Sequence, residues 1–400
     1  MGARGGAPVS ALPPLVEPGP ELTRAELERY ARHLTLPGIG PLGQRRLGSA
    51  RVLVVGAGGL GAPALQYLAA AGVGTLGIVD DDVVAVSNLQ RQVVHRTADV
   101  GRPKAESAAE AVTALNPLVR VRTHPCRLTA DNAVRILGQY DLVLDGADNF
   151  ATRYVVSDAA ALTGIPCVWG SILRFEGQVS VFWAGHGPTY RDLYPEAPPD
   201  GEVPSCAEGG VFGMLPATVG AVMVTEAVKL ITGTGEPLLG RVLLHDALAM
   251  TWREMGLDPD PDAAPVTAVA EPVAVRPPAG GAEPAETVAA GELARLLERR
   301  ARGETAFVLV DVREDWERQL LAIPGAVAVP LQELLDRGPD ALPPEARGAD
   351  LVLHCKAGAR SATALAALRP FYAGREERIR HLEGGVLAWA EQVEPGRPRY

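Results

Sequence analysis

The stretch Arg51–Asp80, RVLVVGAGGLGAPALQYLAAAGVGTLGIVD, decides the fold of this chain. The apolar run Val52–Val55 predicts a strand, and the glycines within Gly56–Gly61 predict a tight turn. The small residues of Ala62–Ala71 predict a helix, which leads to a second strand ending in a carboxylate. This order is typical of nucleotide binding, because the glycines allow close backbone approach and the helix N-terminus favours phosphate.

Asp80 ends the second predicted strand and follows Gly61 by 19 residues (80 − 61 = 19). A carboxylate at that distance is expected to bind a ribose. The glycine motif alone fits NAD or FAD as well as any other nucleotide. The nature of the nucleotide therefore depends on the residues that follow.

Composition limits the class of protein. A chain of 400 residues predicts two or three domains with substantial cores. A net charge of −10 argues against sequence-independent nucleic-acid binding, which usually needs a basic face. Only four cysteines are present, and they are widely scattered: Cys126, Cys167, Cys206 and Cys355. We therefore expect a reduced, cytoplasmic protein rather than a disulfide scaffold.

No targeting or membrane segment is expected. Residues 1–20 are interrupted by prolines and predict a flexible N-terminal tail. The uncharged run Gly209–Thr225 is shorter than the ~20 residues that a spanning helix needs. We expect neither a membrane nor a nucleic acid as a partner.

Strand and helix patterns alternate through residues 21–257, which predicts a doubly wound, Rossmann-like parallel sheet. Leu22–Leu34 reads as one helix with a capping box formed by Thr23 and Glu26. Gly185–Gly210 reads as a long loop, of the kind that is usually functional. The further predicted helices are Lys104–Leu115, Asp131–Leu137, Thr152–Thr163 and Pro216–Ile231, and the further strands are Val119–Thr123, Asp141–Asp145, Pro166–Gly170, Gly177–Trp183 and Arg241–His245.

A second, smaller α/β domain is predicted over residues 287–400, after a Pro/Ala-rich linker at 258–286. Its predicted strands are Phe307–Asp311, Val327–Val329, Leu351–His354 and Ile379–Leu382, and its helices are Gly291–Arg300 and Ser361–Arg369.

Polar residues follow several predicted strands, at the edge where open α/β sheets bind ligands. They are Asp80, Asn88, Arg91, Lys104 and the pair Asp148–Asn149. Basic groups suit a polyphosphate, and a carboxylate such as Asp148 suits Mg²⁺. Taken singly, Lys104 fits a solvated helix residue, Asp148 a helix cap and Arg91 a surface ion pair.

Three motifs together are more specific: Ser87-Asn88-Leu89-Gln90-Arg91-Gln92, Val100-Gly101-Arg102-Pro103-Lys104 and Asp148-Asn149-Phe150-Ala151-Thr152-Arg153. They strongly resemble the family of MoeB, ThiF and ubiquitin-activating enzymes over about residues 21–257. The resemblance implies that the pocket binds ATP·Mg²⁺ as a substrate. It also implies that the C-terminal glycine of a ubiquitin-like carrier attacks the α-phosphate, which gives an acyl-adenylate and pyrophosphate.

The resemblance implies roles for individual residues. Gly59 is expected against the nucleotide and Asp80 at the ribose, and Asp148 is expected to coordinate Mg²⁺. Arg32 matches an arginine that a neighbouring subunit inserts in this family, which implies a homodimer. The phosphate contacts are expected from Asn88, Arg91 and Lys104, and Ser87, Leu89, Gln90 and Asn149 complete the nucleotide-binding motifs.

Cys206 lies in the long loop, in Pro204-Ser205-Cys206-Ala207. A cysteine at this position takes part in thioester or disulfide chemistry in relatives, so the resemblance makes Cys206 a catalytic candidate. MoeB-like proteins often bind zinc through two Cys-x-x-Cys pairs. Here the first pair is replaced by Thr189-Tyr190-Arg191-Asp192 and no cysteine follows Leu257 in this domain, so we expect no zinc.

The second site is the loop Cys355-Lys356-Ala357-Gly358-Ala359-Arg360-Ser361, between a predicted strand and a helix. Inward-pointing amides and a helix N-terminus favour a thiolate. With Asp311-Val312-Arg313 and Gly384-Gly385-Val386, the loop resembles the rhodanese family over about residues 287–400. The resemblance implies a persulfide on Cys355 and a role for Arg360 in stabilising its sulfur anion. Asp311 and Arg313 are expected to be structural, and Trp316 and Trp389 to lie in the core.

In this order the two domains resemble the MoeZ-type fusion of an adenylyltransferase with a rhodanese. The resemblance implies a sulfur carrier of the MoaD, ThiS or CysO type ending in Gly-Gly, whose activated glycine becomes a thiocarboxylate. The sulfur donor is expected to be thiosulfate or a cysteine desulfurase, and the product would serve molybdopterin, thiamine or other sulfur-compound synthesis. An NAD-dependent oxidoreductase and a non-catalytic docking scaffold are the alternatives.

Overall fold

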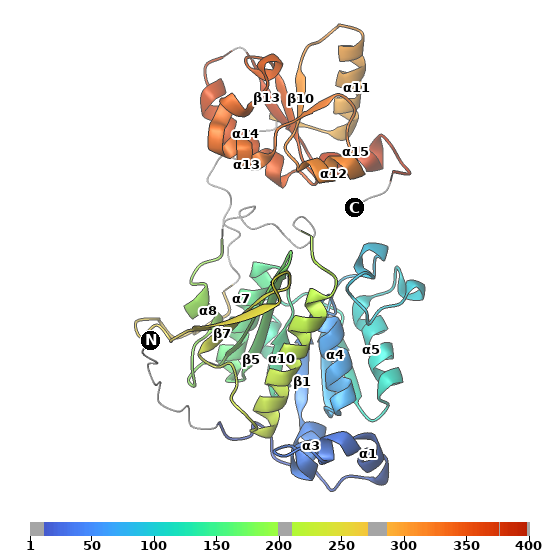
Figure 1. Ribbon diagram of the computed structural model, residues 1–400, viewed down its shortest axis with the longest axis vertical. Coiled ribbons are helices and arrows are strands. Elements are labelled where there is room, and N and C mark those ends of the chain that lie inside the picture. Colours follow the sequence, from blue (N-terminus) through green and yellow to red (C-terminus); the bar gives the residue numbers. More distant parts are fainter. Residues whose placement is uncertain (1–11, 199–209, 271–285, 376, 398–400) are drawn as a thin grey trace. The chain divides into compact units, whose positions relative to one another are not determined.

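The computed structural model describes residues 12–198, 210–270, 286–375 and 377–397. The described residues form two compact units, one built from residues 12–197 and 210–270 and the other from 286–397. Figure 1 traces both units along the chain.

The first unit is built on an eight-stranded sheet with the order β3-β2-β1-β4-β5-β6-β7-β8. The five strands from β3 to β5 pair in parallel, and β6, β7 and β8 extend the sheet in antiparallel fashion. The strands are β1 (Arg51–Val55), β2 (Thr75–Val79), β3 (Arg120–His124), β4 (Leu142–Asp145), β5 (Cys167–Leu173), β6 (Glu176–Phe182), β7 (Arg241–Asp246) and β8 (Thr251–Gly256).

Helices cover both faces of this sheet. They are α1 (Arg24–Arg29), α2 (Ala31–Leu34), α3 (Gly40–Ser49), α4 (Gly61–Ala71), α5 (Lys104–Leu115), α6 (Ala133–Leu137), α7 (Phe150–Thr163), α8 (Tyr190–Leu193) and α10 (Leu215–Thr232). Val52 and Val54 of β1 pack in a core with α4, α5 and α10, whereas Leu53 and Val55 pack in another core with α6 and α7. Because alternate residues of β1 enter opposite cores, its sequence is continuously apolar. The predicted doubly wound fold is confirmed.

The predicted helix over Leu22–Leu34 is wrong in one respect, because it breaks at Tyr30 into α1 and α2. The predicted capping box of Thr23 and Glu26 is present. Tyr30 is buried, and its hydroxyl accepts a hydrogen bond from Asn116 Nδ2 at 2.9 Å. Burial of this ring in the core interrupts a pattern that local sequence predicts as continuous.

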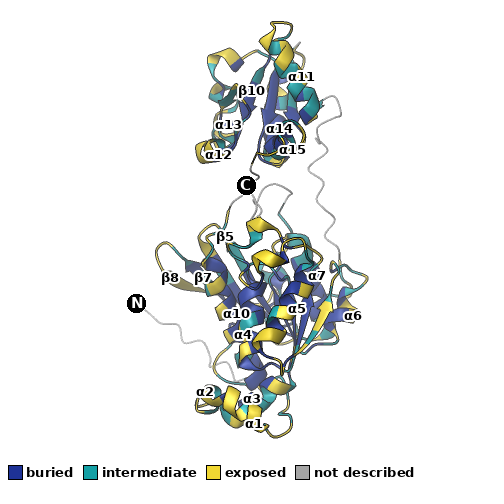
Figure 2. Cartoon of the chain, turned by 90° about the vertical axis from the view of Figure 1, so that its right-hand side faces the viewer, coloured by how far each residue is buried: buried dark blue, intermediate teal, exposed yellow. Residues whose placement is uncertain are grey.

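The helix predicted over Pro216–Ile231 is confirmed as α10. Among the described residues, α10 is the helix long and apolar enough to cross a membrane, but 61% of it is buried inside the unit. Figure 2 shows α10 packed beside α4. Its apolar composition is therefore that of a core helix.

The chain after β8 packs against the first unit, although residues 258–286 were predicted as a linker. The backbone N–H of Asp260 donates to Asp192 Oδ1 at 2.8 Å, and that of Ala270 donates to Asp158 Oδ2 at 3.1 Å. Arg191 in turn pairs with both oxygens of the buried Asp158. In place of the first thiolate pair of zinc-binding relatives, residues 189–192 thus supply hydrogen bonds and an ion pair.

The second unit contains a five-stranded parallel sheet with the order β11-β10-β12-β13-β9. The elements are β9 (Thr287–Val288), α11 (Ala290–Ala301), β10 (Val308–Asp311), α12 (Asp315–Leu320), β11 (Ala326–Ala328), α13 (Leu331–Arg337), β12 (Leu351–His354), α14 (Ala359–Tyr372), β13 (Ile379–Leu382) and α15 (Gly385–Gln392). The predicted smaller α/β fold is confirmed, although β9, α12, α13 and α15 were not predicted. Trp389 is buried as expected, but Trp316 is 52% exposed, so its predicted core position was wrong.

The glycine turn generates a direct test of the fold. A Cβ atom at Gly61 would overlap the carbonyl oxygen of Gly56, whose backbone cannot move without disturbing β1. Gly61→Ala should therefore destabilise the first unit by about 1–3 kcal/mol or more and abolish nucleotide binding. Thermal unfolding and calorimetric ATP titration measure both effects. Gly58→Ala is the matched control, because its added Cβ makes only ordinary contact with Gln92; equal unfolding temperatures for the two variants would contradict this account.

Candidate active sites

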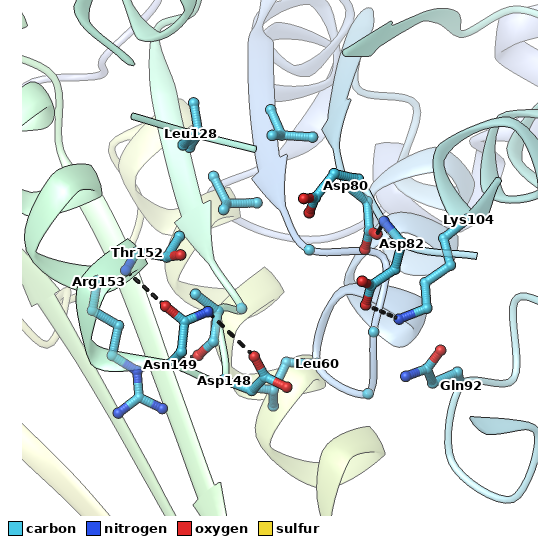
Figure 3. Close-up of a pocket in the computed structure, with 18 of the residues that line it drawn as sticks. Leu60, Asp80, Asp82, Gln92, Lys104, Leu128, Asp148, Asn149, Thr152 and Arg153 are labelled. Atoms are coloured by element: carbon cyan, nitrogen blue, oxygen red, sulfur yellow. Dashed lines mark hydrogen bonds and ion pairs between the residues drawn. The ribbon is translucent and has the colours of Figure 1, made fainter. Parts of the chain in front are cut away.

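A cavity of about 380 Å³ lies at the carboxyl ends of β1, β2 and β4, above the glycine turn. Figure 3 shows Asp80, Asp82 and Lys104 together on one side of the cavity and Arg153 on the other, with Asp148 and Asn149 between them. Of the predicted site residues, the structure brings together five at this cavity's lining in addition to Gly59: Asp80, Arg91, Lys104, Asp148 and Asn149.

Asp80 holds the glycine turn as well as lining the cavity. Its Oδ2 accepts the backbone N–H of Ala57 at 2.8 Å, and its Oδ1 accepts that of Asp82 at 2.9 Å. Burial raises the pKa of Asp80, while Lys104 and the two backbone donors oppose the rise. The ribose contact predicted for Asp80 would be made by a carboxylate that is already fixed in place.

His95 contacts the backbone of Ala57 from the other side and was not identified from the sequence. Its Nε2 lies 3.0 Å from the carbonyl oxygen of Ala57, and its Nδ1 lies 2.9 Å from Ser107 Oγ on α5. A carbonyl oxygen can only accept, so Nε2 must carry the proton. Burial lowers the pKa of His95, which favours the neutral ring that this arrangement needs.

Lys104 is a buried cation at the start of α5, and not the solvated residue that its sequence position alone suggests. Its Nζ lies 2.7 Å from Asp82 Oδ2, and its backbone N–H donates to the carbonyl oxygen of Asp82. Asp82 was not singled out from the sequence, although the run of three acids from Asp80 was a signal. The ion pair fixes a positive charge at the cavity wall.

Arg91 lines the cavity, where its side chain lies beside Gly59 and its Nη1 donates to the carbonyl oxygen of Ser87. Gln92 also lines it, and its buried Oε1 has no hydrogen-bond partner among the described residues. Other residues of the motif do not line the cavity; Asn88 Oδ1 instead accepts the backbone N–H of Ala85. Ser87, Asn88, Leu89 and Gln90 are not among the residues that line the cavity, and their nucleotide contacts stay predictions.

Asp148 and Asn149 have different roles: Asn149 caps a helix, and Asp148 presents a carboxylate to the cavity. Asn149 caps α7 by accepting the backbone N–H of Thr152 at 2.9 Å. Asp148 is exposed at the cavity and is not the helix cap. No group of three or more His, Cys, Asp or Glu side chains suited to a metal occurs in the described parts of the chain. This one exposed carboxylate, which accepts only a long hydrogen bond from Asn149 Nδ2, fits Mg²⁺ that arrives with a polyphosphate, because the ion commonly takes one or two carboxylates plus phosphate oxygens.

Arg32, which was predicted to act on the nucleotide, does not line this cavity. Arg32 is exposed on α2, near α3, and α3 leads into the amino end of β1, opposite the edge that carries the cavity. Figure 1 shows α1 and α3 at that opposite end of the sheet. A role for Arg32 at an adenylation site thus requires another subunit. Cys206 lies outside the described residues.

The cysteine loop of the second unit has the predicted position between β12 and α14. Cys355 is 1% exposed, and its Sγ accepts the backbone N–H of Gly358 at 3.1 Å. The carbonyl oxygens of Cys355 and Lys356 accept the backbone N–H groups of Val386 and Leu387. The loop therefore directs an amide at the sulfur, as predicted.

Gly385 is required for this closure. It has φ +58°, and a Cβ there would press on the carbonyl groups of residues 355 and 356. A side chain at this position would push the first turn of α15 away from the cysteine loop. The pair Gly384–Gly385 is thus explained by close backbone approach.

The guanidinium of Arg360 pairs with a buried carboxylate of the second unit. Its Nη1 and Nη2 form two hydrogen bonds of 2.7 Å with the carboxylate of Glu317, which is buried on α12. To stabilise a sulfur anion on Cys355, as predicted, the guanidinium of Arg360 would have to contact both Glu317 and the sulfur, or leave Glu317. Glu317 was not identified from the sequence because it lies 43 residues away.

Asp311 and Arg313 are structural, as expected. Both side chains are fully buried and pair at 2.7 Å, and Arg313 also donates to the carbonyl oxygen of Leu321. His354 Nε2 lies 3.6 Å from Asp311 Oδ2. This buried charge network supports β12, the strand that ends at His354 directly before Cys355.

Comparison with known proteins matches both units. The ThiF family model matches residues 30–266, and the rhodanese-like domain model matches residues 290–392. The chain is 53% identical over 400 residues to "Probable adenylyltransferase/sulfurtransferase MoeZ" of Mycobacterium tuberculosis, covering 98% of this chain and 100% of the relative. It is 37% identical over 426 residues to "Adenylyltransferase and sulfurtransferase MOCS3" of Mus musculus, covering 98% and 91%.

The first unit has relatives of its own. "Sulfur carrier protein adenylyltransferase" of Thermus thermophilus is 56% identical over 244 residues, covering 60% of this chain and 90% of the relative. Among solved structures, E. coli MccB with ATP has a TM-score of 0.52 at 20% identity, covering 59% of this chain and 74% of that one. This last similarity supports the fold.

The buried histidine makes the stability of the second unit depend on pH. Burial lowers the pKa of His354 to about 4, and the net effect of Asp311, Arg313 and Arg318 does not reverse this. Since an unfolded imidazole titrates near pH ~6.5, the unfolded state binds the extra proton between these values. The free energy of unfolding should be highest above pH ~6.5 and fall by roughly 3 kcal/mol towards pH 4.

Urea unfolding of the second unit in the full chain, followed from pH 7 to pH 4.5, measures this slope. His354→Leu should flatten it, because leucine has a similar apolar bulk and does not titrate. The buried His381, whose pKa is also lowered by burial, leaves a smaller slope in both proteins. An unchanged slope in His354→Leu would refute the assignment.

Proposed function

The chain belongs to the ThiF family and carries a C-terminal rhodanese-like domain, and we propose that it converts a ubiquitin-like sulfur carrier into its thiocarboxylate. It is an adenylyltransferase and sulfurtransferase, a class that uses ATP as a substrate. The observation that carries the proposal is the presence on one chain of a cation-lined cavity and an amide-cradled cysteine. The first site would produce an activated carrier, and the cysteine of the second site would supply the sulfur that this carrier accepts.

In the first step, a carboxylate oxygen of the carrier's C-terminal glycine attacks the α-phosphate of ATP, and pyrophosphate leaves. A carboxylate is a poor acyl donor until its oxygen belongs to a phosphate leaving group. Lys104 and Arg91 supply positive charge at the cavity wall, and the glycine turn supplies backbone N–H groups. Asp148 would hold Mg²⁺, which supplies further charge neutralisation to the phosphates.

In the second step, the terminal sulfur of a Cys355 persulfide attacks the acyl-adenylate carbonyl, and AMP leaves. The product is an acyl disulfide between the carrier and Cys355. A thiolate, from Cys206 or an external thiol, then attacks the Cys355 sulfur. The S–S bond breaks, the carrier keeps the outer sulfur as a thiocarboxylate, and Cys355 forms a disulfide with the attacking thiol.

The partners follow from the same proposal. The carrier ends in Gly-Gly and is of the MoaD, ThiS or CysO type, and the sulfur comes from thiosulfate or a cysteine desulfurase. The thiocarboxylate feeds molybdopterin, thiamine or other sulfur-compound synthesis in the cytoplasm. Sulfur carrier activation is the function that the name of the Thermus thermophilus relative gives.

A homodimer through the adenylyltransferase domain is part of the proposal. An apolar hollow of about 560 Å³ lies on the outer side of α4 and α10 and includes Tyr67, which is 58% exposed. His33 of α2 lines it, next to Arg32. Self-association over this hollow would cover exposed apolar surface and bring Arg32 towards another copy.

The two chemical steps should separate by mutation. Asp148→Ala should lower carrier-dependent ATP–pyrophosphate exchange about a hundredfold or more, because it removes the free carboxylate at the phosphates. Cys355→Ala should leave exchange within about twofold but stop transfer of radiolabelled sulfur to the carrier. The opposite pattern would mean that the two sites are wrongly assigned. Cys206→Ala with an unchanged thiocarboxylate yield would remove that cysteine from the mechanism.

Mixing two inactive variants tests whether each adenylation site receives Arg32 from the partner subunit. Arg32→Ala and Asp148→Ala should each lose exchange activity alone. If Arg32 acts on a partner's site, mixed dimers contain one intact site, and activity should recover to about one quarter of the wild-type value. No recovery after subunit exchange, verified by tagged pull-down, would place Arg32 outside the site.

A further inference from the structure

Arg153 carries a buried positive charge that no carboxylate neutralises among the described residues of the first unit. It lies in the first turn of α7, is 8% exposed and lines the nucleotide cavity. No Asp or Glu oxygen of those residues comes within 4.0 Å of its nitrogens. A buried charge without an ion partner is costly, so such a group usually serves an anion that binds.

Neutral groups hold the guanidinium in one orientation. Its Nε donates to the carbonyl oxygen of Ala147 and its Nη2 to Ser171 Oγ, both at 3.1 Å. Its Cζ lies 5.2 Å from the ring centroid of Phe150 and 5.8 Å from that of Trp169. These contacts fix the plane of the fork without cancelling its charge, and further N–H donors remain, because an arginine has five.

Neither of the nearby ionisable groups, Asp145 and Tyr190, forms an ion pair with Arg153, although burial raises the pKa of both and the charge of Arg153 lowers it. Asp145 is completely buried and uses Oδ1 to accept the backbone N–H of Ala147. Tyr190 contributes a buried hydroxyl, whose pKa burial raises and the charge of Arg153 lowers. The side chain is therefore pre-organised, and a bound anion can supply the close counter-ion that the described residues do not provide.

The position of Arg153 in the cavity indicates which anion it binds. In Figure 3, Asp148 and Asn149 stand between Arg153 and the group formed by Asp80, Asp82 and Lys104. A nucleotide that places its ribose at Asp80 and its phosphates at Lys104 and Asp148 leaves Arg153 beyond the phosphates. The cavity extends on this side to Ile172 and Val211.

An apolar surface continues from this side of the cavity. Phe175 and Phe212 are 41% and 42% exposed, with ring centroids 5.8 Å apart, and Met214 is 63% exposed. Phe175 follows β5, the strand that carries Ser171, four residues further on (175 − 171 = 4).

We infer that Arg153 binds the terminal carboxylate of the acyl substrate, a polypeptide tail that enters over Phe175 and Phe212. This rests on the proposed adenylation and assigns its substrate recognition. The planar fork matches a carboxylate with two hydrogen bonds, and it holds the reacting oxygen beside the phosphates. The nucleotide phosphate is the competing anion, and the test separates the two.

The test compares full-length wild type with Arg153→Gln and Arg153→Lys, and with Arg122→Gln on the exposed edge strand β3 as the control arginine. The probe is a fluorescein-labelled peptide ending in Gly-Gly, made once as the free acid and once as the C-terminal amide. Anisotropy measures its binding in the presence of a non-hydrolysable ATP analogue, and calorimetry measures binding of the analogue alone.

Wild type and Arg122→Gln should bind the acid about tenfold to a hundredfold more tightly than the amide, as for a charge-assisted hydrogen bond. Arg153→Gln should bind both peptides within about twofold of each other while its affinity for the ATP analogue changes less than about threefold. Arg153→Lys keeps the charge but loses the planar guanidinium, so its preference for the acid over the amide should lie between those of wild type and Arg153→Gln. If Arg153→Gln unfolds, the Arg153→Lys result tests the inference in its place.

An acid preference that persists in the variants, or that is absent from wild type, overturns the inference. A loss confined to ATP binding would assign Arg153 to the phosphate instead and also overturns it. Failure of the proposed adenylation is distinguishable, since it removes pyrophosphate exchange from wild type without touching the acid preference.

Discussion

Buried polar groups contact the backbone of Ala57 on both sides, and the shape of the nucleotide cavity depends on these two contacts. Asp80 accepts its N–H at 2.8 Å, and His95 lies 3.0 Å from its carbonyl oxygen. Asp80 directly follows β2, and His95 also contacts Ser107 of α5, the helix that begins with Lys104. One residue of the glycine turn is thereby tied to the carboxylate and the cation that flank the cavity. A flexible turn would offer neither a fixed row of amides nor a fixed distance to Lys104.

Sequence reasoning succeeded where the chemistry was local. The run Val52–Val55 predicts a strand buried on both faces because each of its residues is apolar, and the structure places alternate residues in different cores. Thr23 and Glu26 form the predicted cap because only three residues separate them. The cavity residues Asp80, Lys104 and Asp148 follow from the rule that ligands bind at the carboxyl ends of such strands.

The same reasoning failed where partners are distant in the chain. The pairing of Arg360 with Glu317 depends on how α12 packs beside the cysteine loop, and no local pattern encodes it. The burial of Arg153 depends on Ser171 and Trp169 of β5, which reach α7 only after the sheet forms. β8 is exposed along its whole length, so it lacks the alternation that would have predicted a strand.

The two sites impose complementary requirements on the chain. The first needs fixed cations for a polyphosphate and a neutral, shaped path for a polypeptide tail. The second needs a thiolate cradle, which rests on the buried pair of Asp311 and Arg313 and on the closure at Gly385. Removing one partner of such a buried pair typically costs ~3–5 kcal/mol, so the cradle depends on charges that never touch the substrate.

The most direct measurement is the intact mass of a Gly-Gly-ended carrier after incubation with the enzyme, ATP·Mg²⁺, a sulfur donor and a reducing thiol. The account predicts a mass gain equal to replacement of one oxygen by sulfur, present with ATP and absent without it. A carrier whose mass never changes, or that gains sulfur equally well without ATP, would contradict the coupling of the two sites.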